Sequence, residues 1–295
     1  MRRISETTGT PYAITRPSDV SYVPVPLGDG LEVAIYAGPE HGAMHLETAT
    51  ARLAPGGAVP GHVHPFEESF YITSGEGFLA IGDLSYRVRE GDFGFVPIGV
   101  PHAWSADGDD PLEWLRVRAP QPRPIGGVVG TYPADLAVPT SGRPIDVESV
   151  SQRWVGHFDD TQVPPPGPLA MPGYHGYNIR NVSIRMMVDG TLGAQQHTLF
   201  IVEFEPSTVA TGMSAKEHYH PFEEIYYFLR GSADGIVGGE PVEVGAGDLV
   251  FAGVNTSHGF TNNGDVPMRW IEAQSPMPPE MHGTLFEEDW LRLEG

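Results

Sequence analysis

Residues 61–75 read GHVHPFEESFYITSG, a stretch that places two histidines, a proline and two glutamates in front of an aromatic-rich strand. Residues 217–231, EHYHPFEEIYYFLRG, repeat the same combination. Polar clusters of this kind are unusual beside apolar strands, because a buried polar side chain needs a partner to offset its lost hydration. The repetition indicates that the cluster has a purpose of its own in each copy.

An internal repeat with a fixed offset accounts for the two stretches. His62 and His218 are 156 residues apart, and more than fifty consecutive residues align at this offset without an insertion. The repeat therefore predicts two copies of one unit, at about 20–118 and 177–276. An N-terminal arm (1–19), a connecting segment (119–176) and a C-terminal tail (277–295) complete the chain.

Short aromatic and β-branched runs dominate each unit. In the first unit they are SFYIT, GFLAI, YRVR, FGFVP and LEWLRVR, separated by glycine, aspartate and proline. Such spacing is typical of strands joined by tight turns. The sequence therefore predicts an all-β fold, with a small antiparallel barrel or a double-sheet jelly roll in each unit.

The connecting segment is rich in proline, with eleven prolines between residues 120 and 172. Proline cannot donate to a β-ladder, so we expect this segment to lie outside the sheets. An extended path across both units and a floppy linker are equally open interpretations. One helical turn is predicted near 146–154, and the helical spacing of 284–295 predicts a short helix in the tail.

Composition excludes several classes of partner and site. A formal net charge of −21 argues against binding to nucleic acid or to an anionic membrane surface. The chain has no cysteine, which excludes disulfides, thiolate nucleophiles and cysteine-ligated metals. No apolar run approaches the length of a membrane span. We expect a cytoplasmic protein with no membrane partner.

The histidine clusters have the composition of metal sites. In a strand, residues i and i+2 point to the same side, so His62 and His64 project together, as do His218 and His220. A glutamate follows four residues later, and a third histidine 38 residues after His64. Neutral imidazoles and a carboxylate are ligands of divalent transition metals. A metal site is therefore predicted in each unit.

The motif G-x5-H-x-H-x3,4-E-x6-G, followed by G-x5-P-x-G-x2-H-x3-N, resembles the signature of the cupin superfamily. It reads HVHPFEESFYITSG and GDFGFVPIGVPHAWSA in the first unit, and HYHPFEEIYYFLRG and GDLVFAGVNTSHGFTN in the second. Departures occur at Ala106, Gly253 and Asn255, which are not ligand positions. The chain thus resembles a bicupin, in which two tandem jelly-roll barrels share one polypeptide.

The resemblance implies one divalent transition metal per barrel, namely Fe, Mn, Ni, Cu or Zn. The spacing to Gly75 and Gly231 selects the second glutamate of each pair as the ligand. The implied ligands are His62, His64, Glu68 and His102 in the first barrel, and His218, His220, Glu224 and His258 in the second.

Alternation along the strands also predicts the walls of the two pockets. The candidates are Phe70, Ile72 and Trp104 in the first barrel, and Tyr226, Phe228 and Phe260 in the second. For each of them, a plain core position is the open alternative. Because a tyrosine hydroxyl can donate a proton or a hydrogen bond, Tyr226 is also a candidate catalytic residue. The differing walls predict that the two barrels do not bind the same molecule equally well.

Two further glutamates, Glu67 and Glu223, lie next to the implied ligands. Each is a candidate general base, although an exposed glutamate in a turn is the more common outcome and the favoured interpretation.

Three neutral histidines and one glutamate leave a divalent ion with a net charge of +1, which attracts an anionic or enolisable small molecule. The resemblance favours a dioxygenase-type oxidoreductase that uses O₂, frequently as a homo-oligomer. The alternatives are a non-oxidative lyase or hydrolase, such as a decarboxylase or a ureidoglycine aminohydrolase-like enzyme, and a non-catalytic binding protein. Bicupins that resemble oxalate decarboxylase carry an arginine where this chain has Val59 and Ala215. This difference argues against oxalate.

Overall fold

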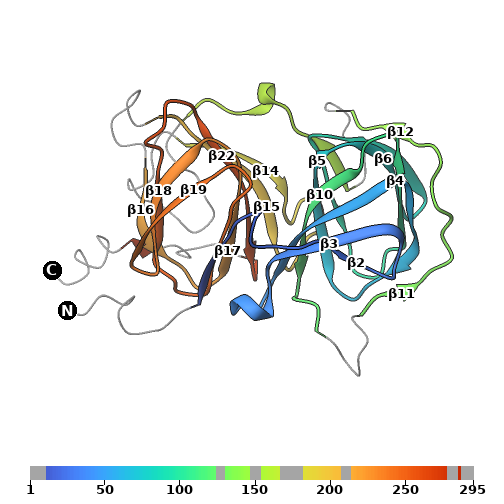
Figure 1. The fold of residues 1–295 in the computed structure, drawn as a ribbon, viewed down its shortest axis with the longest axis horizontal. Helices are drawn as coiled ribbons and strands as arrows, with labels where there is room; N and C mark the ends of the chain where they lie inside the picture. Colours follow the sequence, from blue (N-terminus) through green and yellow to red (C-terminus); the bar gives the residue numbers. More distant parts are fainter. Residues whose placement is uncertain are drawn as a thin grey trace.

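The computed structural model describes residues 11–123, 130–146, 154–166, 182–206, 214–277 and 285–286. Two β-barrels lie side by side, the N barrel in blue to green and the C barrel in yellow to red (Figure 1). Among the described residues the helical elements are the 3₁₀ turns η2 (Pro39–His41) and η3 (Asp160–Gln162). None of the described helices is long and apolar enough to cross a membrane. The predicted all-β fold with two barrels is confirmed.

The N barrel is one continuous twelve-stranded sheet whose central strands run in the order β7-β6-β9-β4-β10-β5-β8. Its strands are β2 (Val23–Pro24), β3 (Asp29–Ala37), β4 (Glu47–Val63), β5 (Glu67–Ser74), β6 (Glu76–Ile81), β7 (Leu84–Arg89), β8 (Asp92–Val96), β9 (His102–Asp107), β10 (Leu112–Ala119), β11 (Tyr132–Pro133), β12 (Arg143–Pro144) and β13 (Val155–His157).

The C barrel consists of two sheets, with the strand orders β1-β20-β17-β22-β15-β14 and β19-β18-β21-β16-β23. Its strands are β1 (Tyr12–Thr15), β14 (Val182–Val188), β15 (Thr198–Phe204), β16 (Ser214–Tyr219), β17 (Glu223–Arg230), β18 (Ser232–Val237), β19 (Glu240–Gly245), β20 (Leu249–Ala252), β21 (His258–Thr261), β22 (Met268–Ser275) and β23 (Leu285–Phe286).

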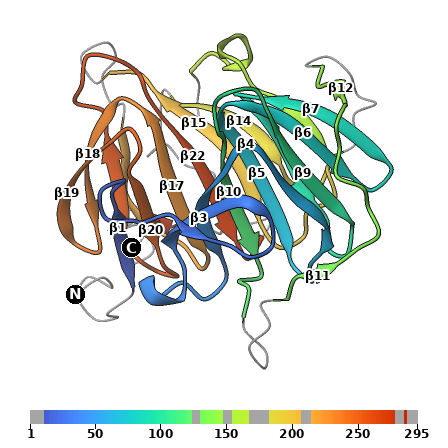
Figure 2. The same cartoon turned by 45° about the vertical axis from the view of Figure 1, so that its right-hand side comes forward.

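Strand β1 belongs to the barrel that is more distant in sequence. It pairs antiparallel with β20, with Tyr12 opposite Ala252 and Thr15 opposite Leu249. Figure 2 shows this blue strand among the orange strands of the C barrel. The sequence predicted only an arm before the first barrel, whereas part of that arm completes a sheet of the second. The N-terminal arm therefore joins the two barrels in addition to the connecting segment.

The connecting segment also contributes strands, so the prediction that its prolines keep it out of the sheets is wrong. Strand β11 pairs with β4, β12 with β7, and β13 with β8. Each of the three pairs on one side only, and proline is tolerated in such edge strands. The helical turn predicted near 146–154 and most of the tail fall outside the described residues. Residues 285–286 of the tail form β23 beside β16.

Three apolar clusters hold the barrels together. Strand β10 shows how they arise, because Trp114 points into the N barrel while its neighbours Leu115 and Val117 face the C barrel. In the C barrel, Trp270 is likewise interior and Ile271 lies at the interface. Each barrel thus has its own core, and a third core joins the two.

A reciprocal pair of buried glutamates adds polar contacts to this interface. The carboxylate of Glu67 accepts hydrogen bonds from the backbone N–H groups of Gln195 (2.8 Å) and Gln196 (2.9 Å) in the C barrel. The carboxylate of Glu223 accepts from the N–H groups of Met44 (2.6 Å) and His45 (2.9 Å) in the N barrel. Both side chains are buried, which corrects the favoured expectation of exposed turn residues. Their oxygens are occupied by backbone donors of the opposite barrel, which gives them a role in joining the barrels.

Replacing Glu223 by glutamine tests this role. The amide nitrogen would face backbone N–H donors, and leaving buried donors unsatisfied is expected to lower the free energy of unfolding by about 2–4 kcal/mol. Glu76→Gln is the control, because its pair with Arg87 (2.7 Å) is about half exposed and is expected to contribute less than about 1 kcal/mol. Urea denaturation measures both. Equal effects of the two variants would contradict the assigned role.

Candidate metal centres

The fold brings the implied ligands together from three strands in each barrel. In the N barrel, β4 and β9 place His62 directly opposite His102, and β5 supplies Glu68. In the C barrel, β16 and β21 pair His218 with His258 in the same way. The second histidine of each H-x-H motif comes directly after β4 or β16. The two sites are therefore built from equivalent positions.

Each of the six histidines is held by a backbone carbonyl two residues away. The Nδ1 atoms lie 2.6–3.2 Å from the oxygens of Pro60, Phe66, Val100, Lys216, Phe222 and Thr256. A carbonyl oxygen only accepts hydrogen bonds, so Nδ1 carries the proton in every case and Nε2 keeps its lone pair. Fixing the tautomer in this manner prepares imidazoles for metal binding.

The C-barrel metal group consists of His218, His220, Glu224 and His258. Their ligand atoms all lie within 4.8 Å of one another, and all four residues are buried. Oε2 of Glu224 is 2.7 Å from Nε2 of His220 and 3.2 Å from Nε2 of His258. Three imidazole nitrogens and a carboxylate at this spacing fit one divalent ion.

The N-barrel metal group consists of His64, Glu68 and His102, whose ligand atoms also lie within 4.8 Å of one another. His62 lies beside the group, with its ring centroid 3.9 Å from that of His102. The Nε2 atoms of His64 and His102 are buried without a hydrogen-bond partner among the described residues. These donors also fit a metal ion, so each barrel has a site for one divalent transition metal.

The electrostatic environment keeps the ligands in their metal-binding protonation states. Burial lowers the pKa of His62, lowers that of His64 to about 4, and holds that of His102 well below its ordinary value. Burial by itself would raise the pKa of Glu68, but the charges of Arg118, Arg116 and the neighbouring histidines together outweigh it and lower this pKa. Neutral imidazoles and an ionised carboxylate result.

The residues behind the ligands differ sharply between the barrels. The N barrel has Arg116 and Arg118 where the C barrel has Glu272 and Gln274. Arg118 donates from Nε to Oε2 of Glu68 at 2.6 Å. Gln274 donates from Nε2 to Oε1 of the equivalent glutamate, Glu224, at 2.6 Å. Sequence reasoning missed this pair, although the 156-residue offset aligns these positions directly.

The C-barrel metal group is surrounded by uncharged donors. The hydroxyl of Tyr226 donates to Glu224 and lies 2.7 Å from Nε2 of His258. Burial, followed by the charge of Glu224, raises the pKa of Tyr226 well above its ordinary value. Burial and Glu224 also raise the pKa of Glu272 well above that of a free carboxyl. Apart from a bound metal ion, the described part of this site has no positive charge.

The barrels also differ in the space available behind the ligands. On β4, Ala49 and Ala51 face the interior of the N barrel. The equivalent residues of the C barrel are Phe200 and Val202, which pair with β22 as Ala49 and Ala51 pair with β10. Both are larger core side chains. Gly94 of the N barrel likewise corresponds to Val250 at the 156-residue offset. The interior of the C barrel is therefore more completely filled.

The predicted wall residues all lie inside their barrels. Phe70 and Trp104 contact each other edge to face, with centroids 5.0 Å apart, and Phe228 and Phe260 do so at 5.7 Å. Ile72 belongs to the N-barrel core. These residues pack as core side chains, and their contact with a substrate stays a prediction.

A pocket opens beside the N-barrel metal group. This N-barrel pocket has a volume of about 880 Å³ and has Glu47, Arg116 and Arg118 among its lining residues. Arg118 both lines it and donates to Glu68, so a single side chain separates the pocket from a metal ligand. Its other lining residues are Ile14, Thr15, Asp19, Val20, Ser21, Val23, Val25, Pro26, Leu27, Val33, Ile35, Glu40, His41 and Thr131.

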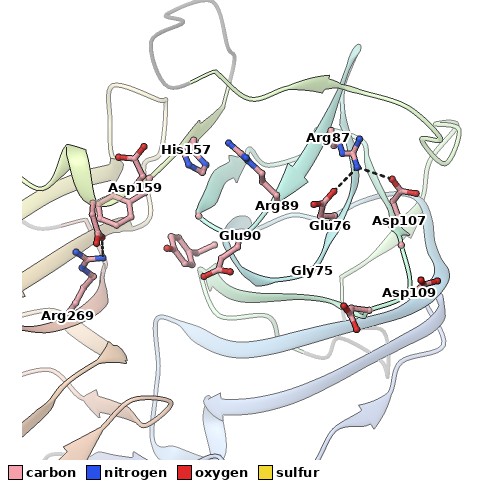
Figure 3. A pocket seen from close by; sticks show the side chains of 16 residues that line it. Gly75, Glu76, Arg87, Arg89, Glu90, Asp107, Asp109, His157, Asp159 and Arg269 are labelled. Atoms are coloured by element: carbon pink, nitrogen blue, oxygen red, sulfur yellow. Dashed lines mark hydrogen bonds and ion pairs between the residues drawn. The ribbon is translucent and has the colours of Figure 1, made fainter.

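Another groove, of about 900 Å³, lies where β5 and β9 end, away from the metal ligands. Some of its charged side chains pair with one another (Figure 3): Arg87 lies 2.7 Å from Glu76 and 3.6 Å from Asp107. Arg269 of β22 pairs with Asp160 of the connecting segment at 2.6 Å. The Arg269–Asp160 pair links the connecting segment to the C barrel.

Comparison with protein families and curated proteins agrees with the repeat. The Cupin domain family matches residues 49–118 and 201–273. The tetracenomycin polyketide synthase protein TcmJ of Streptomyces glaucescens is 33% identical over 95 residues, which is 32% of this chain. The match spans 60% of the length of TcmJ.

Solved bicupin structures share the fold over nearly the whole chain. The oxalate decarboxylase of Lactobacillus farciminis, solved as a formate complex, superposes with a TM-score of 0.64 at 18% identity, covering 97% of this chain and 91% of the other. A Bacillus subtilis oxalate decarboxylase structure, from a study of its Mn(II) centres, gives 0.63 at 19% identity, covering 97% and 81%. At these identities the likeness establishes the fold.

These comparisons contradict the predicted dioxygenase-type oxidoreductase. The similar bicupins are decarboxylases, which are lyases. The prediction failed because three histidines and a glutamate hold metals of both redox and non-redox enzymes, and aromatic walls do not distinguish the two classes. The prediction also did not consider the residues behind the ligands, which differ between the two barrels.

Two matches to the cupin family and two β-barrels with equivalent ligand positions thus converge on one assignment: the chain is a bicupin of the cupin superfamily.

Proposed function

We propose that the protein is a metal-dependent, non-oxidative lyase that acts on a small carboxylic acid in the N barrel. The observation that carries this proposal is the buried pair Arg116 and Arg118 beside the N-barrel metal group. Burial, followed by the charge of Arg118, lowers the pKa of Arg116 to about 10, so the guanidinium group of Arg116 is still charged at neutral pH.

Charge balance favours an anion at this position. The two arginines are opposed by Glu47, which is 3.6 and 3.7 Å away, and by Glu68. These formal charges cancel, so a divalent ion would add two positive charges that no side chain of the site compensates. An anionic substrate supplies that compensation in a buried environment, where charge interactions are strong. The C-barrel metal group offers no comparable cation.

The arrangement suits decarboxylation. The bond between the carboxyl carbon and its neighbour breaks, CO₂ leaves, and the remaining electron pair on the neighbouring carbon takes up a proton, so no oxidant is required. A divalent ion in the N-barrel group would withdraw electron density through an oxygen atom of the substrate. Arg116 and Arg118 orient the anion toward the ligands, and the buried aromatic interior below them limits access of water.

Product analysis tests the proposal. Protein loaded with Mn, Fe, Ni, Cu or Zn in turn is incubated with small oxo acids and dicarboxylic acids, and CO₂ release and O₂ uptake are recorded together. We expect CO₂ release without O₂ uptake. Turnover that consumes O₂, or no turnover of any acid by protein with two ions bound per chain, would contradict the proposed class.

A further inference from the structure

Resting on this proposed function, we infer that the N-barrel pocket selects a carboxylic acid with an extended apolar body, rather than a compact dicarboxylate. The carboxylate is bound by Arg116 and Arg118 at the base, and the apolar body lies along the valine- and leucine-rich walls.

The polar end is defined by donors that lack acceptors. Among the described residues, neither Nε of Arg116 nor Nε1 of Trp114 has a hydrogen-bond partner, although both side chains are more than nine-tenths buried. Buried donors of this kind are rare unless a ligand or water satisfies them. Of the two, Arg116 lines the pocket together with Arg118, so its unpaired donor calls for an acceptor that carries negative charge.

The C barrel shows which group satisfies the equivalent donors. There, Trp270 donates from Nε1 to the carboxyl group of Glu272 at 2.9 Å, and Gln274 donates to the same group at 3.0 Å. Glu272 occupies the position of Arg116. The C barrel thus has its own carboxyl group as the acceptor for its tryptophan, whereas Nε1 of Trp114 and Nε of Arg116 have no acceptor among the described residues, which matches a carboxylate brought by a ligand.

The apolar end is defined by exposed hydrophobic walls. Ile35 and Val23 remain 40% and 60% exposed although both line the pocket, so apolar surface is left open to water beside the charged base. Such surface favours a ligand whose apolar part covers it. The apolar walls of the pocket include Val20, Val23, Val25, Leu27, Val33 and Ile35.

The size of the pocket excludes a good fit to a two-carbon acid. A cavity of about 880 Å³ is within the range that holds drug-sized molecules. Oxalate would bind the arginines but leave the walls uncovered. The fold is shared with oxalate decarboxylases, yet Val59, where those relatives are expected to carry an arginine, belongs to the apolar core of this barrel.

Calorimetric titration of the metal-loaded protein with simple probes tests the inference. The probes are butyrate, hexanoate and octanoate, with 1-octanol as the tail without a carboxylate and oxalate as the carboxylate without a tail. We expect the Kd to fall about fourfold per added methylene group, and both octanol and oxalate to bind at least about tenfold more weakly than octanoate.

A wall variant and a matched control locate the binding site. Ile35→Ser is expected to reduce the dependence on chain length, whereas Val266→Ser, at a half-exposed position of the C barrel, is expected to leave it unchanged. Affinity that does not depend on chain length, or equal binding of octanol and octanoate, would overturn the inference. Chain-length dependence without CO₂ release from any acid would support the ligand class and reject the lyase. Release of CO₂ from oxalate with no binding of octanoate would support the lyase and overturn the ligand class.

Discussion

Replacing Arg116 by glutamate is expected to raise the Kd for a carboxylic acid by about 100-fold or more, because it exchanges an attractive charge for a repulsive one in a buried site. With Glu47 and Glu68 on either side, the variant would have three carboxylates facing one arginine. The affinity loss is measured by the same calorimetric titration, with octanoate as the probe and the metal site filled.

The C barrel indicates that this variant can fold. It carries Glu272 at the same register beside a tryptophan, and that carboxyl group is hydrogen-bonded by both neighbours. Arg116→Gln is the graded control, since it removes the charge without reversing it. The expected order of affinity is wild type, then Arg116→Gln, then Arg116→Glu. Equal affinity in all three proteins would show that the arginine does not contact the acid.

Replacing His64 by alanine is expected to reduce turnover by at least about 100-fold. Loss of a residue that only hydrogen-bonds to a metal ligand typically costs about 10–100-fold in metal affinity or activity, and loss of the ligand itself is expected to cost more. The metal content should fall from two ions to one per chain. Metal analysis and CO₂ release on the same sample measure both effects. Nε2 of His64 has no hydrogen-bond partner within the described part of the chain, so the substitution removes no known hydrogen bond from that atom. Retention of two ions with unchanged turnover would contradict the assignment of His64 as a ligand.

The fold could be predicted because its evidence is local and repeated. The two H-x-H motifs, their glutamates and the third histidines recur at one offset, and a short strand carries each of them. Alternation along a strand then predicts which side chains share a face. The structure places Phe70 and Phe228 inside their barrels, where that alternation predicts them.

The features that were missed depend on contacts between distant parts of the chain. In residues 115–118, LRVR, charged residues alternate with apolar ones, which is typical of a strand with one face in water. Both faces of this strand are in fact buried, because the second barrel covers Leu115 and Val117. Arg116 and Arg118 are consequently directed into the first barrel. The sequence of this strand alone does not show that the second barrel packs against it.

The buried glutamates at the interface illustrate the same limit. Nothing near Glu67 indicates that backbone donors around residue 195 will reach it, since those donors come from the other barrel. The pairing of β1 with β20 joins residues more than 200 positions apart and has no local signal either. The alignment of the two halves, however, does place Arg116 and Glu272 at equivalent positions. This difference is the basis on which we propose that the N barrel is the catalytic one.

The central claim is that catalysis belongs to the N barrel and that the C-barrel metal group does not carry out the reaction. The most direct test is the turnover of His220→Ala, in which only the C-barrel group is damaged, measured beside its metal content. We expect the His220→Ala variant to bind one ion per chain and to keep most of the wild-type activity. One ion per chain with activity lost, together with an active His64→Ala variant, would assign the reaction to the C barrel and contradict the central claim.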